Sequence, residues 1–278
     1  MPKAQANHVT INYDQQGTGE PLILIPYLAA DSACYAFQVA EYAKQFTCFS
    51  LDLRGTGESS QPEGDYSVED LADDVAAFMQ AVGIRKAHVS GLSLGAAVGM
   101  WLAAKHPDRV QSLSLHGAWP RTDRFIKLLV ENWQIVAKAL NDIPEMVIRA
   151  IFPWCFTPEL YADKPQYIQA LSDFVRSRPP QSVASFMQQS NAVIAHDAEV
   201  QLDRITAPTL ITFGEKDAAT STRFAEPLKN GIRNSDLLIF RGCAHAALYE
   251  QVEEFNSRTL EFMRMHSAGS ATSSARSA

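Results

Sequence analysis

Gly91-Leu92-Ser93-Leu94-Gly95 is the stretch of sequence that decides the fold. The run Ala87-His88-Val89-Ser90 before it is typical of a short buried strand, and residues 94–106 after it are rich in Ala, Leu and Met, as in a buried helix. A serine at such a strand-to-helix turn is forced toward a positive φ, so the flanking residues must be small and the hydroxyl projects outward. We therefore predict that Ser93 is a nucleophile.

Six apolar runs bounded by turn residues predict the strands of a sheet. They lie at residues 22–25, 48–51, 87–90, 112–115, 209–213 and 237–240. Runs of this length, separated by helical patterns, indicate strands covered on both faces, as in an α/β fold with a mostly parallel central sheet and flanking helices. One helix is well specified, because Ser67-Val68-Glu69-Asp70 is typical of a capping box. Its predicted apolar face carries Leu71, Val75, Phe78, Met79 and Val82.

The alternation of strands and helices breaks between residues 116 and 202. This segment is rich in aromatic residues, has helical stretches and has no convincing strand. We predict a helical cap at 116–202, inserted into an α/β core domain of residues 1–115 and 203–266. Residues 267–278 consist mostly of Ser, Ala and Gly, a composition that cannot offset the entropy of ordering, so we expect a disordered tail.

Composition limits the partners and the location. The net charge is −7 and there is no Lys/Arg cluster, which argues against nucleic acid or an anionic membrane as the main partner and favours a small molecule. The N-terminal residues lack an apolar signal core, so we expect a cytoplasmic protein. The four cysteines show no zinc-like or paired spacing, and we predict no metal site. The formation of a homo-oligomer stays open.

A serine hydroxyl needs a base within reach and a third group that orients the base. Asp217 in Phe213-Gly214-Glu215-Lys216-Asp217 and His245 in Gly242-Cys243-Ala244-His245 each follow a predicted strand, at the sheet edge where α/β proteins bind ligands. Glu215 is the nearer rival for the acid. Four other histidines lack such a context and are expected to be structural or surface residues: His88, His106, His116 and His196.

Over about residues 8–265 the chain resembles capped α/β-hydrolase-fold serine hydrolases. The resemblance rests on the serine pentapeptide, on residues 52–59 (Asp-Leu-Arg-Gly-Thr-Gly-Glu-Ser), and on Gly214-x-x-Asp217 and Gly242-x-x-His245. It implies that Ser93 is the nucleophile, Asp217 the orienting acid and His245 the general base. Asp52 and Arg54 correspond to a structural turn in that family.

The same resemblance implies an oxyanion hole that combines the backbone N–H of Leu94 with one from the loop after residues 22–25. The usual His-Gly-x-Gly is Pro26-Tyr27-Leu28-Ala29 here, so Leu28 is expected to donate the second N–H. The alternative, in which the Tyr27 phenol enters the pocket, stays open. Tyr27, Trp119 and Trp154 are the expected substrate-binding residues.

We expect a serine hydrolase that cleaves a small apolar ester or lactone through an acyl-enzyme on Ser93, with no cofactor. The chain resembles enol-lactonases, small carboxylesterases, perhydrolases and the C–C bond hydrolases of aromatic breakdown, which the triad does not separate. A serine nucleophile disfavours dehalogenases and epoxide hydrolases, which use a carboxylate. The alternatives are a ligand-binding protein and a cofactor-free lyase or oxygenase on the same fold.

Overall fold

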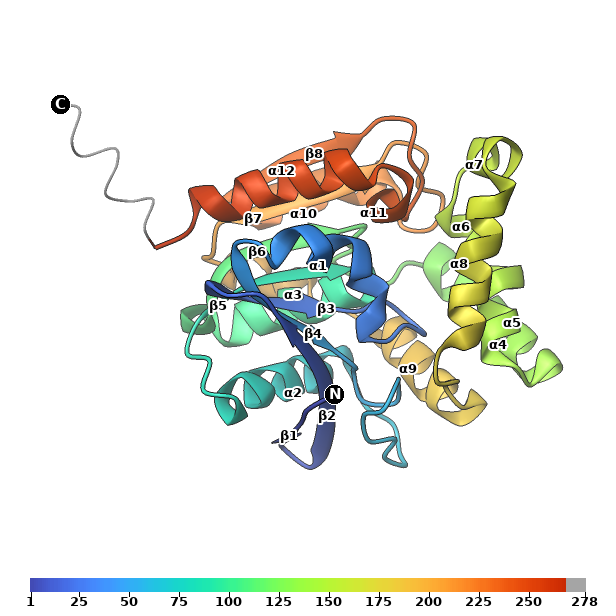
Figure 1. Ribbon diagram of the computed structural model, residues 1–278, viewed down its shortest axis with the longest axis horizontal. Coiled ribbons are helices and arrows are strands. Elements are labelled where there is room, and N and C mark those ends of the chain that lie inside the picture. The colour runs from blue at the N-terminus through green and yellow to red at the C-terminus, as the bar shows by residue number, and fades with distance from the viewer. Residues whose placement is uncertain (269–278) are drawn as a thin grey trace.

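An eight-stranded sheet forms the centre of the molecule (Figure 1). The computed structural model describes residues 1–268. Its strands are β1 (Lys3–Ala6), β2 (Val9–Gln16), β3 (Glu20–Ile25), β4 (Phe46–Leu51), β5 (Ala87–Leu92), β6 (Val110–His116), β7 (Thr209–Gly214) and β8 (Ser235–Phe240). The spatial order is β1-β2-β4-β3-β5-β6-β7-β8. β1 and β2 pair antiparallel, and β3 to β8 are parallel, which confirms the predicted mostly parallel sheet.

The six predicted strands correspond to β3–β8, whereas β1 and β2 were not predicted. β2 carries polar side chains along most of its length, and its last two residues are exposed. β2 lies between the edge strand β1 and β4, and its apolar and polar residues alternate, so it contains no continuous apolar run. The central strand β5, by contrast, is buried at every position.

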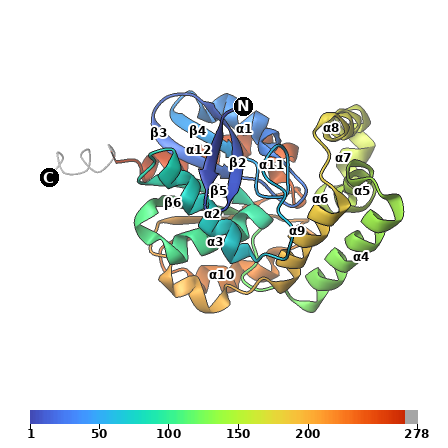
Figure 2. The ribbon, with the colours of Figure 1, turned by 90° about the horizontal axis from the view of Figure 1, so that it is seen from below.

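Helices cover both faces of the sheet (Figure 2). α1 (Ala36–Tyr42) and α12 (Val252–Met265) lie on one face, with the short α11 (Ala247–Glu250) leading into α12. α2 (Val68–Ala81), α3 (Leu94–Lys105) and α10 (Ala225–Gly231) lie on the other. α3 is buried over almost its whole circumference, because it packs against β5, β6 and α2.

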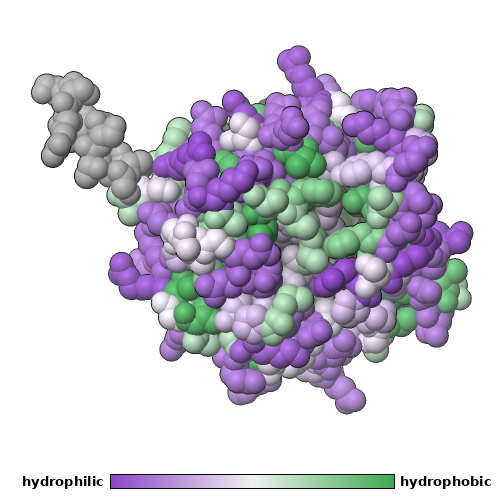
Figure 3. Space-filling view, viewed as in Figure 1, coloured by the Kyte–Doolittle hydropathy of each residue, from purple (hydrophilic) through white to green (hydrophobic). Residues whose placement is uncertain are grey.

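A group of helices between β6 and β7 stands beside the sheet, at the right of Figure 1. The group comprises α4 (Arg124–Leu140), α5 (Ile143–Met146), a π-helical turn (Val147–Ile151), α6 (Phe152–Cys155), α7 (Pro158–Asp163), α8 (Pro165–Ser177) and α9 (Val183–Ala195). We call residues 116–202 the cap and the rest the core. Hydrophilic residues cover most of the face in Figure 3, and hydrophobic ones gather near its middle, where the cap meets the core.

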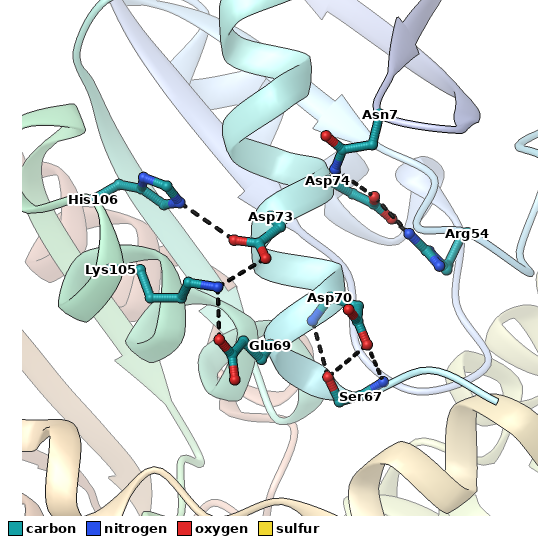
Figure 4. Close-up of polar contacts among 9 residues, drawn as sticks. All are labelled: Asn7, Arg54, Ser67, Glu69, Asp70, Asp73, Asp74, Lys105 and His106. Carbon is teal, nitrogen blue, oxygen red and sulfur yellow. Dashed lines mark hydrogen bonds and ion pairs between the residues drawn. The ribbon is translucent and has the colours of Figure 1, made fainter.

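The start of α2 has the predicted capping box (Figure 4). Ser67 Oγ accepts the N–H of Asp70 at 3.1 Å, and the Asp70 carboxylate accepts the N–H of Ser67 at 2.7 Å. Farther along α2, Asp74 binds the guanidinium of Arg54 through two hydrogen bonds of 2.6 Å. These contacts fix α2 to the turn that follows β4.

That turn is built around the buried carboxylate of Asp52. The carboxylate accepts hydrogen bonds from Ser32 N–H and Asn12 Nδ2, both at 2.7 Å, and from Glu58 N–H at 2.9 Å. Gly57 has φ +53°, and a side chain there would collide with the Asp52 carboxylate. Asp52 and Arg54 therefore have the structural role that the family resemblance implied.

Within residues 1–268, no helix is long and apolar enough to cross a membrane. The predicted disordered tail lies outside the described residues, apart from Ser267 and Ala268, whose N–H groups donate to Arg264 O and to the Glu20 carboxylate.

Burial of His116 in the sheet makes stability depend on pH. The ring hydrogen-bonds to Ser90 Oγ at 3.0 Å and Thr212 Oγ1 at 2.8 Å, and burial lowers its pKa to about 3. An imidazole in an unfolded chain titrates near about 6.5. The neutral His116 ring therefore makes its full contribution to the free energy of unfolding above that pH. This contribution is lost as the pH falls from about 6.5 toward 3.

We expect His116 alone to lower the free energy of unfolding by about 2–3 kcal/mol between pH 7 and about pH 4.5. Burial also lowers the pKa of His196, to about 4, so the total decrease should be larger. Urea denaturation at both pH values should show a smaller decrease for His116→Gln than for the wild type, whereas the exposed-site variant His8→Gln should match the wild type. An unchanged decrease in His116→Gln would contradict the assignment.

Candidate active site

Ser93 occupies the turn between β5 and α3. Its φ is +56° and ψ −117°, a conformation that non-glycine residues rarely adopt. The N–H of Ser93 donates to His116 O at 2.8 Å, and its carbonyl accepts the N–H groups of Ala96 and Ala97 in the first turn of α3. The strained residue is thus held by β6 on one side and by a buried helix on the other.

The two glycines of the pentapeptide permit this turn. A side chain on Gly91 would collide with the backbone of Gly95, and one on Gly95 would collide with the carbonyl of Ile25 at the end of β3. Neither residue has a positive φ. Their small size, and not conformational freedom, is therefore what the site requires.

His245 and Asp217 meet at the carboxyl ends of β8 and β7. His245 Nδ1 lies 2.8 Å from Asp217 Oδ2, and both side chains are almost fully buried. Thr220 Oγ1 donates to the same carboxylate oxygen at 2.9 Å, and the N–H groups of Ala219 and Thr220 donate to Oδ1. Gly117, which follows β6, also lies against the ring, and a Cβ there would be 2.7 Å from His245 Cε1.

These contacts favour an ionised Asp217. Burial opposes its charge, but the positive charge and hydrogen bond of His245, with hydrogen bonds from Thr220 and the Ser221 N–H, hold its pKa below the ordinary value. A carboxylate can only accept, so Nδ1 of His245 carries a proton and Nε2 is left as an acceptor when the ring is neutral. Glu215 does not take part, because it is exposed and its carboxylate accepts the N–H of Gly242.

Ser93 and His245 face one cavity between the core and the cap. The empty space measures about 790 Å³, its open mouth included. Within the described chain, the Ser93 hydroxyl forms no hydrogen bond, and the contact between a catalytic nucleophile and its base often aligns only when a substrate is bound. Cap side chains make most of the apolar wall, among them Ile126, Leu129, Val130, Trp133, Phe152 and Phe156.

Two backbone N–H groups near Ser93 are without hydrogen-bond partners in residues 1–268. Leu94 is the first residue of α3, where a helical N–H has no partner within the helix. Leu28 lies in the loop after β3 and lines the cavity. The close contact of Gly95 with Ile25 brings the start of α3 against the end of β3, from which the Leu28 loop leaves.

Tyr27 lines the cavity, but the proton of its phenol is directed toward Tyr249. Tyr249 donates its hydroxyl hydrogen to Cys34 O at 2.6 Å, so the contact of 2.9 Å between the two phenols has Tyr27 as the donor. Burial raises the pKa of Tyr27 and of Tyr249, and both stay neutral. The Tyr27 oxygen is therefore available to the cavity only as an acceptor.

The two predicted tryptophans differ in position. Trp119 lines the cavity, and its Nε1 donates to Thr122 Oγ1 at 2.9 Å. Trp154 is not part of the wall, because its indole packs against Phe125 with ring centroids 6.2 Å apart. Phe152, Cys155 and Phe156 of the same helical segment face the cavity, so Trp154 lies on the opposite side of the turn.

Glu250, at the end of α11, joins the cap to the loop that carries His245. Its Oε1 accepts Thr157 N–H at 2.8 Å and Thr157 Oγ1 at 2.7 Å, and its Oε2 accepts the N–H of Ala244. Beside it, Ala246 N–H donates to Cys155 O at 2.9 Å. The cap segment around Cys155 and the His245 loop are thus one hydrogen-bonded unit.

Several residues of this site were not predicted from the sequence. Tyr249, Thr220 and Gly117 belong to no recognised motif, and only their nearness to His245 or Asp217, or to the end of a strand, could have indicated them. Three of the histidines expected to be structural or surface residues lie away from the catalytic groups. His88 and His196 are buried and hydrogen-bonded, and His106 faces Asp73. In the part of the chain that the structure describes, no group of three or more His, Cys, Asp and Glu residues could hold a metal ion.

Comparison with known proteins gives a family match over most of the chain. The family model described as the alpha/beta hydrolase fold matches residues 20–252. One curated relative is 3-oxoadipate enol-lactonase 2 of Acinetobacter baylyi, 27% identical over 90% of this chain and 92% of that protein. Another, from Azorhizobium caulinodans, carries the provisional name carbamate hydrolase RutD and is 27% identical over 94% of this chain and 98% of its own length.

Solved structures agree with this match. An esterase from Thermogutta terrifontis superposes with a TM-score of 0.83 at 25% identity, covering 95% of this chain and 98% of its own. The enol-lactonase of Burkholderia xenovorans LB400 superposes with a TM-score of 0.84 at 24% identity, covering 95% and 100%, and shows the shared fold.

The contact between Gly95 and Ile25 leads to a stability prediction. We expect Gly95→Ala to lower the free energy of unfolding by about 3 kcal/mol or more, because the new Cβ meets rigid backbone. Gly99→Ala, one turn later in α3, is the matched control: its Cβ would meet the Leu113 side chain at 3.2 Å, and we expect a change within about 1 kcal/mol. Thermal and urea denaturation measure the stability of both variants. Equal losses of stability would contradict the close approach of Gly95 to Ile25.

Proposed function

The chain belongs to the α/β-hydrolase family of enzymes, and from that membership we propose that it cleaves a carboxylic ester or lactone of a small apolar substrate. The observation that carries the proposal is the meeting of Ser93 and the Asp217–His245 pair at one apolar cavity. The enol-lactonase and esterase names among the similar proteins support the choice of substrate class.

In the first half of the reaction, Ser93 Oγ attacks the substrate carbonyl carbon while His245 Nε2 takes the hydroxyl proton. The carbonyl π electrons move to the oxygen, which the N–H groups of Leu28 and Leu94 stabilise as an oxyanion. Collapse of this intermediate breaks the bond to the alkoxide, and His245 donates its proton to that leaving group. The acid part of the substrate stays on Ser93 as an ester.

In the second half, a water molecule takes the place of the leaving alcohol. His245 accepts one proton of the water, the hydroxide attacks the acyl carbon, and the second oxyanion occupies the same hole. Collapse releases the carboxylic acid, and the proton returns to Ser93. Asp217 stays ionised throughout and stabilises the protonated ring.

The cavity wall supports an apolar acyl or ring-bearing substrate. We propose that Trp119 and Tyr27 contact it, Trp119 through its indole face and Tyr27 through a phenol oxygen that can only accept a hydrogen bond. A substrate with a hydroxyl or N–H group near the reacting carbonyl would match that acceptor.

Turnover of a panel tests the proposal: p-nitrophenyl esters of increasing acyl length, γ-lactones and ring-cleavage diketones. We expect sustained hydrolysis of esters or lactones by the wild type and a decrease in kcat of about 10⁴-fold or more for Ser93→Ala, which should remain folded. A single burst without turnover would favour a binding protein, and turnover of the diketones alone would favour a C–C hydrolase. A Ser93→Ala enzyme with more than a tenth of the wild-type kcat would exclude a serine acyl-enzyme.

Asp217→Asn should be far more damaging than Glu215→Gln. The amide can donate to Nδ1, which favours the imidazole tautomer with the proton on Nε2, and we expect kcat to fall by about 10³- to 10⁴-fold. Within residues 1–268 the Glu215 carboxylate accepts a hydrogen bond only from the Gly242 N–H, so Glu215→Gln should lower kcat far less than Asp217→Asn. Steady-state kinetics of both variants, with circular dichroism as the control for folding, decide the matter; the reverse ranking would assign the orienting role to Glu215.

A further inference from the structure

The loop that carries Leu28 contains a strained residue. Residues 27–30 form a β-turn closed by a hydrogen bond of 3.2 Å from Ala30 N–H to Tyr27 O. Ala29, the third residue of this turn, has φ +60°. Type II turns require a positive φ there and usually have glycine or asparagine, because a Cβ disfavours that conformation. An alanine in this place needs a contact from outside the turn to hold it.

Gln189 of the cap helix α9 makes that contact. Its Oε1 accepts the N–H of Ala29 at 3.0 Å, and its side chain is completely buried. The same oxygen also lies 3.4 Å from Gln181 Nε2. Two donors face this atom, which identifies it as the amide oxygen.

Packing alone does not explain a glutamine at position 189. Its Nε2 is buried and has no hydrogen-bond partner among residues 1–268. An unpartnered buried N–H destabilises the folded state, and an apolar side chain of the same size would avoid it. The chain nevertheless has an amide here, and the close contact of its oxygen is with the backbone of the turn.

We propose that Gln189 is a positioning residue for the oxyanion hole, which it serves by holding the Leu28–Ala29 peptide so that the Leu28 N–H faces the reacting carbonyl. The inference rests on the proposed function, since the Leu28 N–H matters only where an oxyanion forms beside Ser93. Return of Ala29 to a negative φ would rotate the Leu28–Ala29 peptide, and the backbone of Leu28 would turn with it. The cap would then take part in the chemical step through a hydrogen bond to the core.

Gln189→Met tests this, because methionine has a similar volume and offers the turn no oxygen acceptor. With p-nitrophenyl butyrate we expect kcat to fall about 10- to 100-fold with little change in KM, since complete loss of an oxyanion donor costs about 10²- to 10³-fold. The Kd of phenylboronic acid, which forms a tetrahedral adduct with the serine, should rise by a similar factor. The matched control is Gln181→Met, which alters the neighbouring amide without touching Ala29 and should change kcat by less than about threefold.

Two further variants separate positioning from general damage. Gln189→Glu keeps an acceptor oxygen and should retain more of kcat than Gln189→Met. Adding Ala29→Gly to Gln189→Met should restore much of the lost kcat, because glycine adopts a positive φ without strain. Hydrogen exchange of the Ala29 amide, followed by NMR, should be slow in the wild type and faster in Gln189→Met, whatever the substrate.

Three results would overturn the inference: a wild-type kcat in Gln189→Met, a loss confined to KM, or unchanged exchange of the Ala29 amide. A double variant no more active than Gln189→Met would likewise show that the conformation of Ala29 is not what Gln189 holds. Failure of the proposed function would give other results than failure of this inference. The wild type would then turn over no ester or lactone, or Ser93→Ala would stay active. The exchange measurement reports on the Gln189 contact even in that case.

Discussion

The rest of the site depends on one backbone-to-backbone contact, which Gly95 of α3 makes with Ile25 at the end of β3. It places the first turn of a buried helix directly against the strand end from which the Leu28 loop leaves. Ser93, one residue before α3, is then held at a positive φ between that helix and the carbonyl of His116. Three parallel strands, β3, β5 and β6, thereby converge on Ser93, so this close packing lies where the chemistry is proposed.

The cap is more than a cover for this site. It supplies most of the apolar wall, and it also hydrogen-bonds to the backbone of two core loops: Gln189 to the turn at Ala29, and Thr157, through Glu250, to the loop of His245. Tyr167 adds a third contact, from its hydroxyl to Tyr249 O at 3.0 Å. Buried hydrogen bonds of this kind fix geometry because their alternatives leave polar groups unpaired. The arrangement of the reacting groups is therefore a property of the core and cap together.

Local patterns in the sequence were sufficient for the strands β3–β8 and for the start of α2, because apolar runs and capping residues act within a few positions of one another. They were insufficient for β2, whose polar side chains follow no apolar run. The contacts of Tyr249 with Tyr27 and of Gln189 with Ala29 join residues far apart in the chain, and no spacing rule connects them. Trp154 shows a different limit: the aromatic content of the cap indicated an apolar pocket, but not which side of a helical turn faces it.

The contacts of Glu250 limit how freely caps can be exchanged between proteins of this architecture. The cap enters the chain after β6 and leaves it before β7, so an exchange of caps between relatives would keep Glu250 in the recipient and replace Thr157. A donor cap without an N–H and a hydroxyl at that place would leave a partly buried carboxylate with only the Ala244 N–H beside it. Chimeras should therefore be designed with Thr157 and Glu250 inherited as a pair, although they lie on opposite sides of the recombination boundary.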